Sequence, residues 1–279
     1  MRPNRPTRAA LRLAAGYFAV SVAWILLSDR FARRLAFGNE DAERYLQSLK
    51  GLGFVAITSI GLFLVALRYL RRVEDSTDRL RSAYDETLAG WASALDIRDR
   101  STAQHTERVT RRTVALARQF GFEGRALDDV RRGATLHDIG KMGVPDDVLG
   151  KKGPLTDDEW VQMRRHPELA VQMLQGIEYL RPALTIPLCH HEKWDGSGYP
   201  AGLVREQIPL EARLFAVVDV YDAITSVRPY RQPMQADEAR ATIEAGSGTH
   251  FDPDVVVALL ALVDAENRAE AGRGPATPQ

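Results

Sequence analysis

The chain has 279 residues, with 37 basic and 37 acidic side chains and a formal net charge of zero. This balance gives no electrostatic case for a nucleic acid polymer as a partner. The one cysteine, Cys189, excludes an intrachain disulfide and is typical of a reducing compartment. We expect Cys189 to be a small buried hydrophobe, although its position beside His190 leaves metal ligation as the alternative.

Two segments near the N-terminus are predicted to span a membrane. Residues 13–28 and 51–67 carry no charge and are flanked by basic residues, so we expect spans at about 11–28 and 50–68 in a membrane hairpin of residues 1–70. Arg12 can extend the usable length of the first span by snorkelling. The alternatives are buried core helices or, for the first span, a cleaved signal peptide. No small-x-small cleavage motif follows that span, which favours an uncleaved anchor.

A linker helix is predicted over residues 71–96. Its apolar side chains recur at spacings of three, four or seven, as in either a parallel dimer seam or a helix packed onto the next domain. We expect a homodimer seam in the first half and domain packing in the second. The stripe comprises Val73, Leu80, Tyr84, Leu88, Trp91 and Leu95.

Beyond residue 96 the pattern is helical, with no alternating run long enough for a sheet, so we predict an all-α fold. Thr156 and Glu159 form a capping box before a helix that ends near His166, and Pro167 fits the first turn of the next helix. Further helices are expected at 181–194 and 209–226, and a flexible tail at 267–279.

Five of the six histidines and two aspartates form a spaced series of potential metal ligands: His105, His137, Asp138, His166, His190, His191 and Asp219. Imidazole and carboxylate suit Fe, Mn, Ni or Zn, and this many groups exceed the needs of one tetrahedral ion. A lone histidine is usually a hydrogen-bonded core residue, and His250 fits that interpretation. The series instead predicts at least two ions.

The most economical geometry places Asp138 between the two ions as a bridge. The expected remaining ligands are His105, His137 and Asp219 for one ion and His166, His190 and His191 for the other. Two such ions activate a shared water and clamp a phosphoryl group for in-line displacement. The residues therefore predict phosphodiester hydrolysis.

Four motifs in order resemble the HD-GYP family, a bacterial branch of the HD-domain phosphohydrolases. They are H-D-I-G-K at 137–141, H-P at 166–167, H-H-E-K-W-D-G-S-G-Y-P at 190–200 and D-V-Y-D-A-I-T-S at 219–226. The resemblance covers about residues 84–264. It implies an HD-type helical bundle, here 97–266, with a di- or trinuclear iron or manganese centre that hydrolyses cyclic di-GMP to linear pGpG or on to GMP.

The same resemblance implies the roles of individual residues. The seven residues of the series above would be the metal ligands. Lys141, Arg228 and Arg231 match positions that contact substrate phosphate, with solvated surface charge as the alternative for the two arginines. Asp138, Lys141 and Asp222 would serve catalysis, although Asp222 could instead pack its helix.

Two further features of the resemblance concern substrate and metal number. The Gly198-Tyr199-Pro200 segment is either a lid that closes over substrate or docks GGDEF-type cyclases, or a tight surface turn. Some family members carry a glutamate, a ligand of a third metal, where this chain has Ser101. Serine is a poor ligand for a hard cation, so we expect two ions and release of pGpG.

The combined prediction is a membrane-tethered cyclic di-GMP phosphodiesterase. Two spans put both termini on one side, and an intracellular nucleotide requires the catalytic domain in the cytoplasm, at the bacterial inner membrane. The alternatives are a catalytically weak module that binds the nucleotide or a partner, and an HD phosphohydrolase for another cyclic dinucleotide.

Overall fold

The computed structural model describes residues 5–37, 39–99, 103–226 and 232–271. The chain divides into two compact units, Met1–Leu80 and Arg81–Gln279. Within the described residues every regular element is helical, apart from an isolated bridge between Ser247 and Phe251. The all-α prediction is therefore confirmed.

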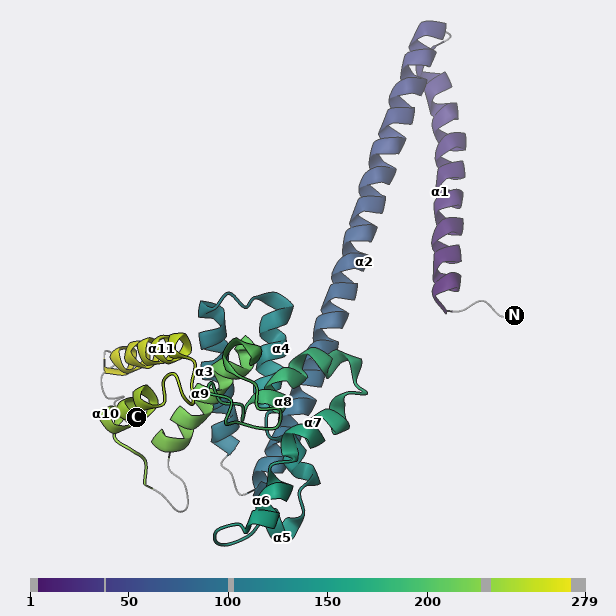
Figure 1. Cartoon of the computed structure of the whole chain (residues 1–279). Coiled ribbons are helices and arrows are strands. Elements are labelled where there is room, and N and C mark those ends of the chain that lie inside the picture. Colours follow the sequence, from purple (N-terminus) through teal and green to yellow (C-terminus); the bar gives the residue numbers. More distant parts are fainter. Residues whose placement is uncertain (1–4, 38, 100–102, 227–231, 272–279) are drawn as a thin grey trace, which may run out of the picture. The chain divides into compact units, whose positions relative to one another are not determined.

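The first unit contains a helical hairpin. Helix α1 (Arg5–Leu35) is followed by the start of helix α2 (Glu40–Asp99) (Figure 1). Asn39 caps α2, because its side-chain oxygen accepts hydrogen bonds from two backbone amides of the first turn at 3.0 and 3.1 Å. The two helices contact each other where the rings of Trp24 and Phe54 lie 5.9 Å apart.

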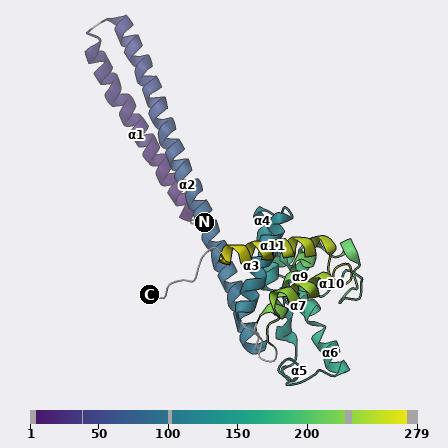
Figure 2. The same ribbon diagram turned by 90° about the vertical axis from the view of Figure 1, so that its left-hand side faces the viewer.

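Helix α2 is longer than predicted, because the second predicted span and the predicted linker helix form one uninterrupted helix (Figure 2). Among the described residues, α2 is the helix long and apolar enough to cross a membrane, with an 18-residue window of mean hydropathy 2.0, none of it buried. The first predicted span, 11–28, includes Leu13, whose side chain lies outside the described part of the chain. That span stays a prediction.

In the second half of the apolar stripe of α2, two side chains are buried and two, Tyr84 and Trp91, are exposed. Leu88 and Leu95 are buried, and Leu88 belongs to a core cluster of the second unit. Val73 and Leu80 are exposed. The second half therefore packs onto the helical domain, and the dimer seam of the first half stays a prediction.

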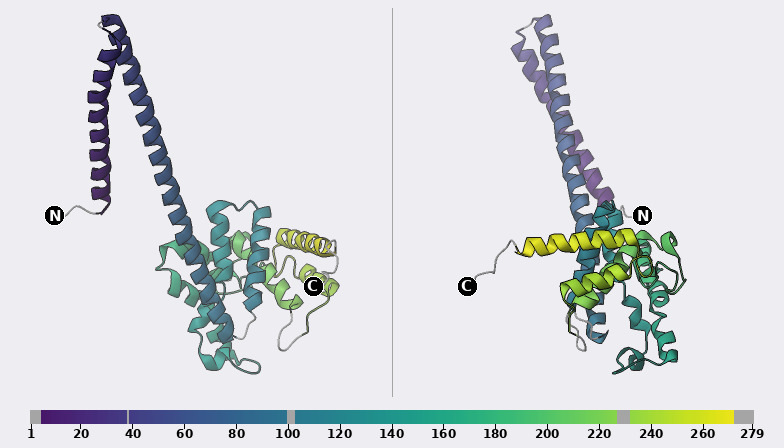
Figure 3. Two further views of the ribbon diagram at one scale, coloured as in Figure 1. Left: turned by 180° about the vertical axis from the view of Figure 1, so that it is seen from behind. Right: turned by 60° about the vertical axis from the view of Figure 1, so that its left-hand side comes forward.

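The second unit is a bundle of short helices around α9, which packs against α3, α8, α10 and α11 (Figure 3). After α2, its elements are α3 (Ala103–Gln119), α4 (Gly124–Thr135), η1 (Ile139–Gly143), α5 (Asp146–Leu149), α6 (Asp157–Met163), α7 (His166–Leu174), η2 (Glu178–Leu184), α8 (Thr185–Cys189), η3 (Arg205–Gln207), α9 (Leu210–Thr225), α10 (Ala236–Ala245) and α11 (Pro253–Ala271).

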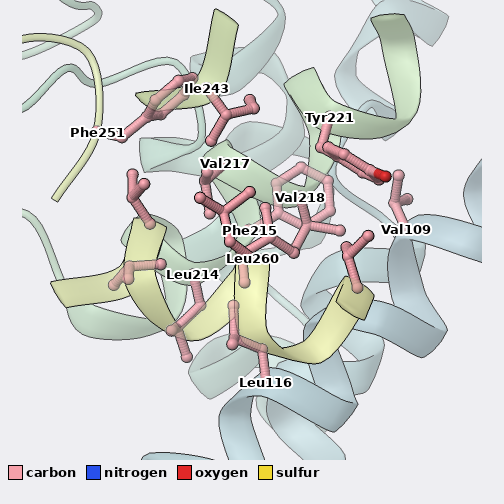
Figure 4. Packing of buried hydrophobic residues seen from close by; sticks show 14 of the residues in the cluster. Val109, Leu116, Leu214, Phe215, Val217, Val218, Tyr221, Ile243, Phe251 and Leu260 are labelled. Atoms are coloured by element: carbon pink, nitrogen blue, oxygen red, sulfur yellow. The ribbon is translucent and has the colours of Figure 1, made fainter. Parts of the chain in front are cut away.

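The main core surrounds α9. Phe215, Val217 and Val218 of α9 are fully buried and pack with Leu116 of α3 and Leu260 of α11 (Figure 4). Five consecutive residues of α9, 214–218, are buried, so neighbouring elements enclose this part of the helix on every side. Carboxylates on such a helix have lost much of their water, so they require partners inside the protein.

The predicted starts of two helices are confirmed. Thr156 caps α6 in a capping box, in which its hydroxyl accepts from the Glu159 amide and the Glu159 carboxylate accepts from the Thr156 amide. Helix α9 follows Pro209 and ends at Thr225. Both starts depend on local chemistry that the sequence displays.

Two other predicted boundaries are wrong. The helix expected at 181–194 is divided into η2, which contains Pro182, and α8, which contains Pro187 and ends at Cys189. Helix α11 continues to Ala271, past the start of the tail predicted at 267. Its end is held where Glu266 pairs with Arg112 at 3.0 Å.

Candidate metal centre

All seven predicted ligands lie together in the second unit. They form two groups, and within each group the potential ligand atoms lie within 4.8 Å of one another. We refer to them as the Asp138 group, made of Asp138, His166, His190 and His191, and the Asp219 group, made of His105, His137 and Asp219. The prediction divided the five histidines and Asp219 in the same way, with Asp138 shared between the two groups.

Asp138 lies where the two groups meet. Its Oδ2 is 3.2 Å from Nε2 of His137 in the Asp219 group. Its Oδ1 is 3.5 Å from Nε2 of His166 and 3.8 Å from Nε2 of His190 in its own group. The two oxygens of one carboxylate thus face different groups, which is the geometry that a bridging ligand requires.

Three of the histidines lie just after the C-terminus of a helix. There the free carbonyls of the helix end hold their rings in place through hydrogen bonds. The last carbonyls of a helix have no partner within it. Each Nδ1 donates to a carbonyl three residues earlier: His137 to Ala134 at 2.9 Å, His166 to Met163 at 2.9 Å and His190 to Pro187 at 3.0 Å. The Nε2 lone pairs are left for the centre, as in metal-ligating histidines.

The electrostatics of the Asp138 group suit a divalent cation. Burial lowers the pKa of His166, lowers that of His190 well below its usual value, and lowers that of His191 to about 4. These rings are therefore neutral at neutral pH and have lone pairs to donate. Burial alone would raise the pKa of Asp138, but the charges of Lys141 and His137 hold it well below the usual value. The residues present fit two metal ions.

Asp222 lies behind His105 rather than beside the Asp138 carboxylate. It is fully buried, its Oδ2 is 2.7 Å from Nδ1 of His105, and Arg108 donates two hydrogen bonds to it at 2.7 and 2.9 Å. Burial would lower the pKa of His105, but hydrogen bonds to Asp219 and Asp222 raise it to about 9. Neither predicted role, catalysis or helix packing, included this contact, in which Asp222 orients the His105 ring.

We expect Asp222→Asn to weaken metal binding without removing a ligand atom. The amide cannot accept the bond from His105 with the strength of a carboxylate, and loss of such an outer partner typically lowers metal affinity about 10- to 100-fold. Titration of the metal-free protein with Mn²⁺ measures this. An unchanged affinity would show that the orientation of His105 does not depend on the Asp222 carboxylate.

Lys141 lies half-buried between two carboxylates. Its Nζ donates to Asp138 at 2.7 Å and to Asp99 at 3.0 Å. Burial would lower the pKa of Lys141, but the two carboxylates raise it, so the ammonium stays charged beside the centre. The predicted phosphate contacts Arg228 and Arg231 lie outside the described residues, as does Ser101.

The segment at 198–200 packs against the edge of the centre. The Tyr199 ring stacks on His191 at 4.7 Å, and the Tyr199-Pro200 peptide bond is cis. A Cβ on Gly198 would lie 2.3 Å from the Lys193 backbone nitrogen, so only glycine fits there. The contact with His191 is compatible with both predicted interpretations of the segment, a closed lid and a tight turn.

Sequence analysis missed the residue that anchors this segment. Glu192 is buried, and its carboxylate accepts hydrogen bonds from the Ala201 amide at 2.7 Å and the Leu203 amide at 3.0 Å. Its position directly after the histidine pair was the available signal. Arg108 was also missed. Its position three residues after His105, on the same helix face, was the available signal.

Cys189 belongs to neither group. It is buried with Ile208 and Ala212, and burial raises the pKa of its thiol to about 11. The interpretation as a small buried hydrophobe is confirmed. His250 also lies outside both groups, stacked on Phe251 with ring centroids 4.2 Å apart.

The chain is similar to known proteins. The HD domain family profile matches residues 92–255. A cyclic di-GMP phosphodiesterase response regulator, RpfG of Xanthomonas campestris pv. campestris, is 42% identical over 197 residues, which are 70% of this chain and 52% of that protein. A cyclic di-GMP phosphodiesterase of Vibrio cholerae serotype O1 is 36% identical over 249 residues, covering 84% of this chain and 49% of that protein.

A third relative is named for a different substrate. The 3'3'-cGAMP-specific phosphodiesterase 2 of Vibrio cholerae is 37% identical over 183 residues, covering 65% of this chain and 35% of that protein. The chain thus spans about half or less of the length of these curated relatives. It belongs to the HD domain family, whose phosphohydrolases bind divalent metal ions.

Proposed function

We propose that this protein is a metal-dependent phosphodiesterase that hydrolyses cyclic di-GMP to linear pGpG. The observation that carries the proposal is the pair of adjoining ligand groups that share the Asp138 carboxylate. Relatives named as cyclic di-GMP phosphodiesterases support the substrate. The ligand set argues against a weak binding module, because such a module does not need seven converging ligands.

Two divalent ions at such a centre would lower the pKa of a shared water and offset charge on the phosphoryl group. In the proposal, Asp138 holds the two sites together and Lys141 contacts the substrate phosphate, with Arg228 and Arg231 as further cationic contacts. Asp222 acts by orienting His105. A cyclic dinucleotide carries two negative phosphates, and fixed cations near the reacting one stabilise the charge that develops there.

We propose iron or manganese as the metal. The ligands are imidazole and carboxylate groups, and the thiol of Cys189 is protonated and lies outside both groups. Thiolate ligation would have favoured softer ions. With Ser101 in the position of the third-metal glutamate, two ions per chain are expected. Replacing Ser101 with glutamate should raise the metal content toward three.

A mixed cyclic dinucleotide is the second candidate substrate. The similarity to a 3'3'-cGAMP-specific phosphodiesterase favours it, and the metal ligands do not distinguish the two purine bases. Competition between cyclic di-GMP and 3'3'-cGAMP for the same preparation would rank them. A higher kcat/KM for the mixed dinucleotide would replace the first candidate.

We also propose that the hairpin tethers the protein to the bacterial inner membrane, with the second unit in the cytoplasm. The apolar side chains of both helices support two spans, since Phe18 of α1 is 69% exposed and Phe63 of α2 is 64% exposed. Exposed apolar surface of this extent is unfavourable in water and favourable in lipid.

Two kinds of protein partner belong to the proposal. Val73 and Leu80 form an exposed apolar stripe on α2 that would pair with a second copy of the chain. The segment at 198–200 would dock GGDEF-type cyclases. Crosslinking at residue 80 in membranes tests the first, and copurification of a cyclase, lost on replacement of Tyr199, tests the second.

The deciding experiment uses the full chain in detergent, purified without oxygen. It is incubated with cyclic di-GMP and either Mn²⁺ or Fe²⁺, and the products are separated by chromatography. A metal-dependent pGpG peak is expected. GMP as the main product would contradict the role given to Ser101, and bound metal without turnover of either dinucleotide would contradict the proposed function.

A further inference from the structure

The η1 turn connects the Asp138 ligand to the rest of the bundle, and the last turn of α2 holds it. Arg98 donates to the carbonyls of Lys141 and Met142 at 3.0 Å each and to the carbonyl of Val144 at 2.8 Å. It also donates two hydrogen bonds to the Asp146 carboxylate, at 3.0 and 2.5 Å. One guanidinium therefore contacts four residues of a single short segment.

The Lys141 carbonyl already accepts a hydrogen bond from the Val144 amide at 3.0 Å, and Arg98 adds a second donor to it while also donating to the carbonyls of Met142 and Val144. At the C-terminus of a helical turn the last carbonyls have no amide within the turn to bond to. A guanidinium presents its donors in a rigid plane, so it can serve several neighbouring acceptors at once, which an ammonium on a flexible stem cannot. Arg98 thus closes the C-terminal end of η1.

The other side of η1 packs directly on a ligand helix. A Cβ on Gly140 would lie 1.8 Å from the His166 carbonyl oxygen, so the backbone of η1 touches the first turn of α7. The segment is held between α7 and Arg98. Asp138 directly precedes η1 and Lys141 lies within it, so the position of η1 sets where both side chains meet the centre.

We propose that Arg98 is a positioning residue of the metal centre, which fixes η1 so that Asp138 faces both ligand groups. The carbonyl bonds carry this role rather than the ion pair with Asp146. The Asp146 side chain is 87% exposed and that of Arg98 only 28%, and an ion pair with a solvated partner contributes little. For turnover the inference rests on the proposed function, but for metal binding it does not.

The test compares four variants of the full chain in detergent: Arg98→Gln, Arg98→Lys, Asp146→Asn and, as a matched control on exposed surface, Arg111→Gln. Each is stripped of metal and titrated with Mn²⁺, and kcat and KM are then measured with cyclic di-GMP. Arg98→Gln should weaken Mn²⁺ binding about tenfold or more, as for lost outer-shell support. It should lower kcat with little change in KM.

The other variants distinguish loss of the Arg98 hydrogen bonds to η1 from a general loss of stability. Arg98→Lys keeps the charge and should fall between Arg98→Gln and the unchanged chain, while Asp146→Asn and Arg111→Gln should bind Mn²⁺ normally. Unchanged Mn²⁺ affinity in Arg98→Gln overturns the proposal, as does an equal loss in Asp146→Asn. If Arg98→Gln does not fold, Arg98→Lys decides, and normal affinity in it overturns the proposal.

The two proposals can fail separately. If the unchanged chain binds Mn²⁺ and hydrolyses no cyclic dinucleotide, the proposed function fails. The Mn²⁺ titrations of the four variants still decide the role of Arg98.

Discussion

Replacing Asp138 with asparagine should abolish turnover and reduce bound metal while leaving the helical fold in place. The carboxylate is the group whose two oxygens face different ligand groups, so the change affects both sites at once. A residue that acts as part of a unit typically costs on the order of 10³-fold or more in rate when it is lost. Metal content and product formation measure the two effects.

The matched control for this variant is Asp237→Asn, which changes the same groups on the exposed face of α10. It should leave metal content and turnover unchanged. Circular dichroism confirms that both variants keep their helices. If Asp138→Asn retained two ions per chain, the bridging geometry would not be what assembles the centre.

Gly140→Ala should destabilise the second unit strongly. The added Cβ would lie 1.8 Å from the His166 carbonyl oxygen and 2.6 Å from the Ala170 amide nitrogen, and both are backbone atoms that cannot rotate away. Overpacking of this kind costs about 3 kcal/mol or more, because η1 and α7 must separate. Thermal unfolding should show the loss, together with weaker metal binding.

The same substitution at Gly90, Gly90→Ala, should instead raise the stability of the protein. Gly90 lies inside α2 with nothing within 4 Å of the added Cβ. Alanine in a helix interior is favoured over glycine by about 0.5–1 kcal/mol. A fall in unfolding temperature for Gly140→Ala and a rise for Gly90→Ala would assign the effect to the contact with α7. Two falls would indicate that α2 itself does not tolerate change.

The ligands were predictable because metal chemistry restricts them to a few residue types, which the sequence displays in order. His137 with Asp138, and His190 with His191, stand out as adjacent pairs without any knowledge of the fold. How the ligands divide into two groups was predicted from the bridging role of Asp138. The structure reproduces that division, because three histidines follow helix ends and point inward.

The supporting residues were not predictable in the same way. Glu192, Arg108 and Arg98 act through backbone carbonyls, amides or another side chain, so their roles depend on distances between segments far apart in the sequence. Local pattern also failed at 181–194, where the single predicted helix is divided into η2 and α8 and ends at Cys189. Local chemistry did fix two helix starts from the sequence, the capping box at Thr156 and the proline before α9.

The wide spacing of the ligands along the chain, from α3 to α9, has a consequence for the protein inside a cell. A centre assembled from so many segments cannot exist in the unfolded chain, so bound metal stabilises the folded form alone. At a free metal concentration of 100 times Kd that stabilisation is about 2.7 kcal/mol. Chains made during metal shortage should therefore be less stable and be degraded faster than chains that have bound metal.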